Sequence, residues 1–330
     1  MTFAEEISKW KKKRILVIGE ALIDKYIMGY ADRISPDAPV PNIKIEQNLT
    51  YLGGIGLVLK YIKSLGGIPE VCTIIGDDYE GNFFLRRIKE LNIDSSGIVI
   101  DTAINTPQIT RVKARNQHLL RLEKDYEGNI SEKVVEQLFE KLSSRSSDLE
   151  AILILDYGIG ELFHDTFIQK LLHQLKNTYN APIIARPNLD NYYVYEDIEM
   201  IKMNLQKALR MLSIECCTDT SIAIVGKRVM NTSQCQNLLI NNIVAESFLF
   251  QKHKENFMKY PSNITTPVRS YVAVGSVIMA VLGLCYAADI AIPESVQLAL
   301  YAGSLSAILS PVEFFNPESL LKYISSSKNI

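Results

Sequence analysis

Runs of apolar residues recur along the chain with two different periods, and they predict alternating strands and helices. Arg14–Gly19 is apolar after its first residue and ends on glycine, which indicates a buried strand. From Leu57 to Leu65 the apolar positions follow helical spacing and stop at Gly66-Gly67. The same alternation predicts strands at 71–75, 151–155, 182–185 and 221–225, and helices at 83–91, 131–143, 161–176, 204–213, 275–288 and 294–309. This order favours an α/β fold, in which a parallel sheet is flanked by helices on both faces.

Two segments break this rhythm. Residues 22–50 contain Pro36, Pro39 and Pro41 among apolar residues, which suits edge strands or a loop crossing better than a helix. In residues 105–122 polar and apolar positions alternate, as in an antiparallel strand with one face in water. We expect the two segments to pair as a small antiparallel lid beside the main sheet, within a single domain that spans residues 1–330.

One long apolar stretch raises the question of a membrane span. Tyr271–Ala288 is 18 residues without a charge, which is the lower limit for a helix that crosses a bilayer. Gly275, Ser276 and Gly283 interrupt it, and its place late in an α/β pattern fits a buried helix better. We therefore expect no membrane contact.

Composition narrows the function classes. The chain has 330 residues, of which 47% are hydrophobic, so it is long enough for a large core. Its net charge of -2 and pI near 6.2 argue against a general nucleic-acid binder. Five cysteines without CxxC spacing indicate reduced thiols, and four histidines show no metal-ligand spacing. Because residues 1–13 contain no apolar signal core, we expect a cytoplasmic protein.

Two blocks in the first 125 residues resemble a known family. Ile15–Ile45 contains RISPDAPVP, and 106–123 contains RNQHLLRLE. Both resemble the heptose 7-phosphate kinase half of bacterial ADP-heptose synthesis enzymes, which are ribokinase-like sugar kinases. Between them LKYIKSLGG and IIGDDYEGN follow the general ribokinase-like pattern, whereas the resemblance weakens after residue 125 and no HxGH of the nucleotidyltransferase half occurs. The resemblance implies a Rossmann-type core, a β lid over the sugar, and a homodimer clasped through the lids.

The resemblance assigns sugar-binding roles near the start of the chain. Asp24, Arg33 and the turn Gly53-Gly54 would face sugar hydroxyls. The chemistry is reasonable, because a carboxylate accepts hydrogen bonds from two adjacent hydroxyls and a glycine pair lets the backbone approach a ligand. These residues are the predicted sugar-hydroxyl site.

A second group is predicted on the lid. Arg115, Gln117 and Arg121 would lie on one face of an extended strand, since their numbers are all odd. By the resemblance they would reach a sugar phosphate or the partner subunit. From the residues alone, the same three side chains would be a charged solvent face.

The catalytic box of the family is altered. In ribokinase-like enzymes a GAGD box enters a helix, whose N-terminus binds the transferred phosphate while the final Asp is the base. The matching segment is SYVAVGS, with Ser270 at the acidic position and Ser276 at the base position. Ala273, Val274 and Gly275 would form the anion hole. A serine hydroxyl is far too weak a base for this step, and general-base help is worth roughly 10²–10⁴ in rate.

Other positions change in the same direction. The family's Asn-x-x-Glu, whose Glu helps to hold magnesium, corresponds to Asn204 and Lys207. The nucleotide loop Thr-x-Gly-x-x-Gly is predicted to survive only as Gly226. Further departures are Leu57 for the sugar-binding Asn, Arg186-Pro187-Asn188 for Asp-Pro-Lys, and Asp156-Tyr157-Gly158-Ile159-Gly160 for Asp-Tyr-x-Lys-Gly. No metal ligand and no intact catalytic residue are predicted.

The sequence thus predicts a catalytically impaired kinase, or pseudokinase, that binds a sugar phosphate or acts as a scaffold in surface-polysaccharide (lipopolysaccharide) metabolism. The expected partners are a small-molecule sugar phosphate, a second copy of the chain and a partner enzyme. The alternative is an active sugar kinase with relocated catalytic groups. ATP and Mg²⁺ would be cofactors only in that case.

Overall fold

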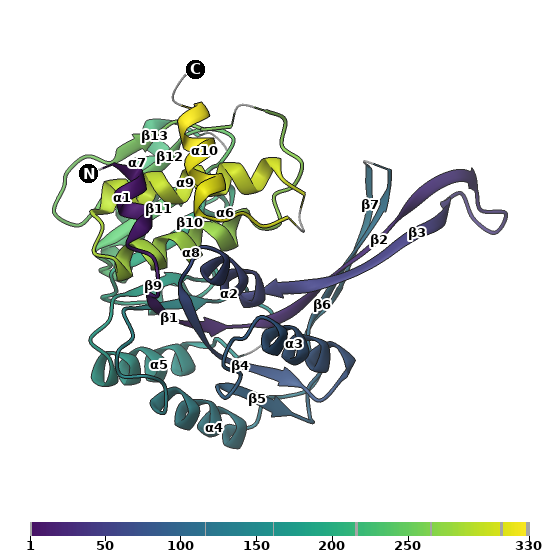
Figure 1. Cartoon of the computed structure of the whole chain (residues 1–330), viewed down its shortest axis with the longest axis horizontal. Helices are drawn as coiled ribbons and strands as arrows, with labels where there is room; N and C mark the ends of the chain where they lie inside the picture. Colours follow the sequence, from purple (N-terminus) through teal and green to yellow (C-terminus); the bar gives the residue numbers. More distant parts are fainter. Residues whose placement is uncertain are drawn as a thin grey trace.

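The computed structural model of the chain describes residues 2–115, 117–160, 162–214, 217–264, 266–310 and 313–327. Within them, a main sheet of nine strands is covered by helices, and a second sheet of four strands projects from its side (Figure 1). From one edge to the other, the main sheet consists of β13 (Met258–Tyr260), β12 (Ser247–Gln251), β11 (Asn237–Asn241), β10 (Met200–Asn204), β9 (Ile183–Arg186), β8 (Ala151–Leu155), β1 (Arg14–Gly19), β4 (Ile68–Gly76) and β5 (Ile98–Asp101). The α/β architecture predicted from the alternation is confirmed.

The main sheet is parallel from β11 to β5, and β12 and β13 add an antiparallel edge. In β1, Ile15 and Val17 join the core on one face, whereas Leu16 and Ile18 join the core on the other. A strand that is buried on both faces needs apolar side chains at every position, because successive residues point to opposite sides. This requirement explains why the run of residues 15–18 is apolar throughout.

Helices cover both faces of this sheet. One face carries α1 (Phe3–Ser8), α2 (Ile55–Ser64), α3 (Tyr79–Glu90), α8 (Val274–Ala287), α9 (Ile292–Ile308) and α10 (Pro317–Ser327). The opposite face carries α4 (Glu132–Ser143), α5 (Asp165–Thr178), α6 (Leu205–Met211) and α7 (Asp219–Ser233), with the short 3₁₀ helix η1 (Tyr192–Val194) beside them. The uncharged stretch forms α8, which is buried almost throughout. In the part of the chain that the structure describes, no helix has the length and apolarity to cross a membrane.

The predicted strand at 221–225 is wrong, because these residues lie inside α7. A short apolar run such as SIAIV fits either a buried strand or a buried helix turn. The residues before it decide the outcome: the Thr218 hydroxyl accepts from the Ser221 N–H (3.1 Å), and the Thr218 N–H donates to the Ser221 hydroxyl (2.8 Å). This capping box starts a helix.

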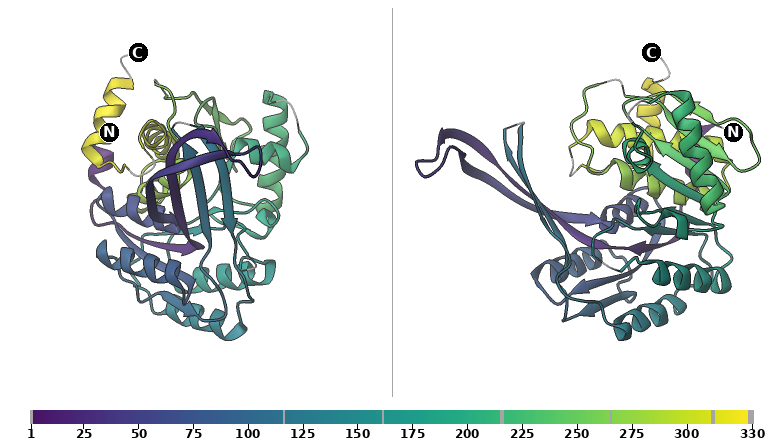
Figure 2. Two further views of the ribbon diagram at one scale, coloured as in Figure 1. Left: turned by 90° about the vertical axis from the view of Figure 1, so that its right-hand side faces the viewer. Right: turned by 180° about the vertical axis from the view of Figure 1, so that it is seen from behind.

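The second sheet is the lid, and it extends well beyond the helical body (Figure 2). Its strand order is β3 (Pro41–Gly54), β2 (Ala21–Ile34), β6 (Gln108–Ala114) and β7 (Gln117–Lys124). The prediction of a separate lid sheet is confirmed, although the two segments join through a parallel pair, β2 with β6. The division of the chain into a single domain with a lid over 22–50 and 105–122 stays a prediction.

Candidate functional site

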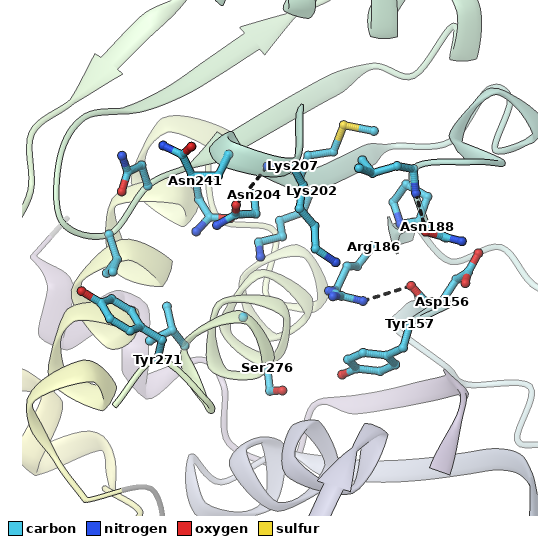
Figure 3. A pocket seen from close by; sticks show the side chains of 18 of the residues that line it. Asp156, Tyr157, Arg186, Asn188, Lys202, Asn204, Lys207, Asn241, Tyr271 and Ser276 are labelled. Carbon is cyan, nitrogen blue, oxygen red and sulfur yellow. Dashed lines mark hydrogen bonds between the residues drawn. The ribbon is translucent and has the colours of Figure 1, made fainter. Parts of the chain in front are cut away.

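Polar and charged side chains collect where the central strands of the main sheet end. β8 is followed by Asp156 and Tyr157, β9 ends at Arg186, and β10 carries Lys202 at its middle. The carboxyl ends of parallel strands meet at one edge of a sheet, where open α/β sheets bind their ligands. The N-terminus of α8 lies at the same edge, so that strand ends and helix surround one crevice (Figure 3).

The crevice has two cavities, and we call the one beside α8 the helix-side cavity. Its volume is about 470 Å³, and it is lined by three cationic side chains, Arg186, Lys202 and Lys207. Among the described residues that line it, the only acid is Asp156. The Asp156 carboxylate accepts from the Gly158 N–H (2.9 Å) and from the Tyr195 hydroxyl (3.1 Å). The net charge of this cavity is therefore positive.

Lys202 is the most unusual side chain of the site. It is 3% exposed and lines the helix-side cavity. Its Nζ stands 3.5 Å from the place that a Cβ would take on Gly275, in the first turn of α8. Within the described residues, no hydrogen bond or ion pair holds its ammonium group. Burial, and then the charges of Arg186 and Lys207, lower the pKa of Lys202 to about 7.

Arg186 is held in place between the strand ends. Its Nη1 donates to the backbone carbonyl oxygen of Asp156 (3.0 Å), and its guanidinium lies 4.3 Å from the centre of the Tyr157 ring. Both contacts leave other N–H donors of the Arg186 guanidinium group available. Arg186 therefore presents fixed positive charge to the crevice.

The first turn of α8 has free backbone donors. The helix begins at Val274, and its N-cap, Ala273, has no side chain that can cap it. Among the described residues, no acceptor takes the N–H groups of Val274, Gly275 and Ser276. Such uncapped N–H groups and the helix dipole favour an anion. Of the three residues predicted to form an anion hole, Val274 and Gly275 line the cavity, whereas Ala273 is buried and does not line it.

The second cavity lies under the lid, and we call it the lid-side cavity. It has a volume of about 360 Å³ and is lined by residues of β2, β6 and β7 together with the turn after β8. The residues that line both cavities are Tyr157, Arg186, Lys207, Val272 and Ser276. The two cavities therefore adjoin, with Ser276 at their junction.

A buried ion pair organises the lid-side cavity. Asp24 on β2 is 4% exposed and Arg111 on β6 is 9% exposed, and the Arg111 guanidinium donates to Asp24 Oδ1. The same guanidinium lies 5.4 Å from the centre of the Tyr26 ring. Burial raises the pKa of Asp24, and the charge of Arg111 opposes that shift. Asp24 is therefore paired with a lid residue across the β2–β6 junction.

A second buried carboxylate supports the turn between the cavities. Glu20 is fully buried and accepts from the backbone N–H groups of Tyr157 and Ile159, the latter at 2.8 Å. Burial, and then the charge of Asp156, raise the pKa of Glu20 to about 8. Because it lines neither cavity, Glu20 acts on the position of the Tyr157 turn and not on a ligand.

The structure brings together part of the predicted sugar-binding set. Asp24, Gly54 and Arg121 line the lid-side cavity, together with Leu57. Gly54 has a φ of +51°, which favours glycine, whereas a Cβ on Gly53 would stand 2.2 Å from Leu22 Cδ1 and would displace that side chain.

Other predicted lid residues lie elsewhere. Arg33 is exposed near the far end of β2, and Gln117 is exposed at the start of β7. Arg115 has a φ of +52° and forms the turn before β7, so it does not share a strand face with Gln117 and Arg121. None of these three residues, Arg33, Arg115 and Gln117, lines either cavity. Of the three lid residues predicted to share a face, only Arg121 is at the site, and it pairs with Glu123.

The segment that was matched to the catalytic box leads into α8. Ser276 is 6% exposed in the first turn of α8. Ser270 precedes the helix, where its hydroxyl accepts from the Val272 N–H (3.2 Å), and it does not line the cavities. Asn204 lines the helix-side cavity as the N-cap of α6, and its Oδ1 accepts from the Lys207 N–H (3.3 Å).

The predicted role of Gly226 is wrong, because this residue lies in the middle of α7 and lines neither cavity. A Cβ on Gly226 would stand 2.2 Å from the Phe250 ring, so the glycine permits close packing of α7 on β12. A strand and a turn do follow one another beside the cavity, but these are β11 and residues 242–246. Asn241, Asn242, Ile243 and Val244 of that segment line the cavity, and it contains no glycine.

The site does not fit a magnesium ion. Mg²⁺ requires hard oxygen ligands such as carboxylates. The helix-side cavity offers only Asp156 among its described lining residues, and both oxygens of Asp156 are already hydrogen-bonded. Lys207 projects positive charge where the resemblance implied a metal-binding glutamate. No group of three or more His, Cys, Asp or Glu in the described chain could hold a metal.

Sequence reasoning missed Lys202 and Arg111. Lys202 is the one charged residue of the strand MIKMN, whereas Arg111 shares the strand QITRVKA with Lys113. A lone cation in a predicted buried strand is a usable signal, because such a charge is costly unless it has a partner or a function. Tyr271, which is 60% exposed at the rim of the helix-side cavity, carried no comparable signal.

Comparisons with known proteins agree with this geometry. The family model described as "pfkB family carbohydrate kinase" matches residues 12–310. The chain belongs to this family.

Curated relatives of this pfkB-family chain include bifunctional proteins HldE. The protein from Helicobacter pylori strain P12 is 25% identical over 306 residues, which cover 91% of this chain and 65% of that protein. The protein from Desulfatibacillum aliphaticivorans is 25% identical over 300 residues, which cover 91% of this chain and 60% of that protein.

The chain thus spans less than two thirds of the length of these relatives. Among solved structures, phosphofructokinase-2 from Escherichia coli in complex with potassium superposes with a TM-score of 0.77 at 15% identity, over 96% of this chain and 99% of that one. A tetrameric inhibited form of the same enzyme gives a TM-score of 0.74 at 14% identity, over the same shares of the two chains. The predicted ribokinase-like fold is confirmed.

Proposed function

We propose that this pfkB-family protein binds a sugar phosphate, of the heptose phosphate type, in the lid-side cavity and is impaired in phosphoryl transfer. The observation that carries the proposal is Ser276 at the junction of the two cavities. Phosphoryl transfer needs a carboxylate to position or deprotonate the attacking hydroxyl. Ser276, in the first turn of α8, is the residue that the family resemblance assigns to that role.

The engagement of the neighbouring acids supports the same proposal. The acidic residues that line the two cavities in the described chain are Asp24, Glu123, Asp125 and Asp156. Asp24 pairs with Arg111, and Glu123 pairs with Arg121. Asp156 bonds to Gly158 and Tyr195. Three of the four acids are therefore committed to the protein itself.

The lid-side cavity has the chemistry for a phosphorylated sugar. Arg121 and Lys124 of the lid and Lys207 of α6 supply positive charge, and Asp125 supplies an acceptor for hydroxyl groups. The relation to bifunctional proteins HldE and the motifs RISPDAPVP and RNQHLLRLE favour a heptose phosphate as the sugar. A role in the metabolism of a surface polysaccharide, with a dimer formed through the lids and with a partner enzyme, follows as part of the proposal.

The fourth acid favours one alternative, an active kinase with a relocated base. Asp125 lines the lid-side cavity, is exposed, and has no partner for its carboxylate within the described residues. A carboxylate with this freedom could accept a proton from a sugar hydroxyl. In this alternative ATP and Mg²⁺ would be required.

Turnover distinguishes the two. The purified chain is incubated with ATP, Mg²⁺ and a panel of sugar phosphates that includes heptose 7-phosphate, and release of ADP is followed by a coupled assay. We expect no turnover above background, and we expect Ser276→Asp to raise it while the matched variant Ser276→Asn does not. A turnover number near or above about 1 s⁻¹, the ordinary range for kinases, would overturn the proposed impairment. If Asp125→Asn then abolished it, the relocated base would be identified.

A further inference from the structure

A buried cation without a partner points into the helix-side cavity. Lys202 is 3% exposed, and its ammonium group has no hydrogen bond or ion pair among the described residues. Figure 3 shows its side chain directed from β10 toward the first turn of α8. Burial of a lone charge costs free energy, so an anion that enters the cavity would supply the missing partner.

Two further cations face the same space. Lys207 on α6 and Arg186 at the end of β9 line the helix-side cavity and also the junction to the lid side. Arg186 is fixed by its bond to the Asp156 carbonyl oxygen (3.0 Å). The N–H groups of Val274 and Gly275, free within the described chain, add the positive end of α8. All four features converge on one place.

This charge pattern conflicts with a metal site. A divalent cation next to Lys202, Lys207 and Arg186 would be repelled, and the single lining acid, Asp156, is already bonded. The groups that neutralise a phosphate chain are therefore already part of the protein. A cavity of about 470 Å³ is large enough for more than one phosphate group.

We propose that the helix-side cavity binds a chain of two or more linked phosphates without a divalent metal, and that Lys202, Lys207 and Arg186 provide the positive charge that a metal ion supplies elsewhere. Lysine serves as a point charge for phosphate and arginine as a two-pronged donor. This inference deepens the proposed function, because it names the ligand class that an impaired kinase crevice retains. It involves binding alone and no bond-making step.

Calorimetric titration in EDTA tests the inference. Inorganic pyrophosphate and ADP are titrated into the full chain, first with EDTA and then with Mg²⁺. We expect both to bind in EDTA, and Mg²⁺ to leave the affinity unchanged or to weaken it. Binding of ADP without binding of pyrophosphate would also support the site and would identify a nucleotide as the source of the phosphates. Absence of binding by both in EDTA, with binding restored by Mg²⁺, would overturn it.

Three variants assign the effect to the cations. Lys202→Met keeps the length of the side chain and removes its charge, and we expect the affinity in EDTA to fall at least tenfold. Lys207 has an exposed side chain, so Lys207→Glu should leave the fold intact. We expect this variant to lose metal-free binding. Lys170→Met on α5, whose side chain is exposed and lines neither cavity, is the matched control and should bind as the parent does. Unchanged binding by Lys202→Met would contradict the proposal.

The outcome is independent of the turnover assay. Metal-free diphosphate binding together with measurable turnover would leave this inference standing and remove the proposed impairment. Metal-dependent binding without turnover would remove this inference and leave the proposed impairment standing. A melting temperature for each variant, measured without ligand, confirms that a lost affinity is not a lost fold.

Discussion

The two cavities differ in whether their buried charge has a partner. Under the lid, Asp24 is buried against Arg111, so each charge has a partner. Beside α8, Lys202 is buried to the same degree and has no partner within the described residues. A paired buried charge is costly to break, whereas an unpaired one is costly to keep. The lid side thus compensates its buried charges within the protein, whereas the helix side retains a buried charge that an anionic ligand would compensate.

Breaking the lid-side pair should give the largest effect. Arg111→Met leaves the Asp24 carboxylate buried and unpaired, and we expect a loss of about 3–5 kcal/mol in the free energy of unfolding, measured with urea. The double variant Arg111→Met with Asp24→Leu removes both charges and should recover most of the loss. A loss below about 1 kcal/mol for the single variant would show that the pair does not act as described.

Removing the charge of Lys202 on the helix side should instead increase the free energy of unfolding. Folding lowers the pKa of Lys202 from 10.5 to about 7. Below pH 7 the folded chain therefore keeps a buried charge at Lys202, whereas between pH 7 and 10.5 Lys202 loses its proton on folding. Stability of the parent therefore rises with pH between about 7 and 10.5. We expect Lys202→Met to stabilise the chain by about 2–4 kcal/mol at pH 6, with a smaller gain at pH 9.5.

Urea unfolding at the two pH values checks this, and Lys170→Met serves as the control without effect. A destabilised Lys202→Met variant would mean that the ammonium group has a stabilising partner, and the contrast between the two cavities would disappear.

The corrected place of Gly226 can be tested separately from both cavities. A Cβ at this position would stand 2.2 Å from the Phe250 ring, so Gly226→Ala should cost about 1–3 kcal/mol by overpacking. Because Gly226 lines neither cavity, the affinity for pyrophosphate should stay the same. A loss of affinity with unchanged stability would instead support a nucleotide loop at this residue.

The smallest effect on stability is expected on the exposed part of the lid. Arg121 pairs with Glu123 at the surface, so Arg121→Gln should change the free energy of unfolding by less than about 0.5 kcal/mol. Its affinity for a sugar phosphate should fall about tenfold, because one charge-assisted hydrogen bond is lost. Arg115→Gln, at the turn outside the cavity, is the matched control. Equal losses of affinity in Arg121→Gln and Arg115→Gln would contradict the placement of Arg121 at the cavity and of Arg115 outside it.

Several elements were predictable because a local pattern determines them. β1 and β8 begin and end at the predicted residues, since a strand buried on both faces must be apolar throughout. The helix within the uncharged stretch was predicted for a related reason, because α8 is packed against both the sheet and α9. The lid was visible as a change of period, but its parallel junction was not, because a period of two specifies a strand and not its neighbour.

The site was only partly predictable. Serine at the predicted base position and lysine at the predicted glutamate position are local departures from a motif, so the sequence alone was enough to propose them. The role of Lys202 depends on which cations and donors lie around it, and Arg186, Lys207 and Gly275 come from different elements. Gly226 was misplaced because a five-residue apolar run does not distinguish strand from helix.

By itself, the sequence determined most of the order of strands and helices and predicted the loss of acidic groups from the catalytic box, because both depend on neighbours along the chain. Only the tertiary structure decided that Asp24 is paired with Arg111 while Lys202 is left without a partner in the described chain. The reason is physical: the energy of a charge depends on which atoms surround it in space, and those atoms are contributed by segments far apart in the sequence.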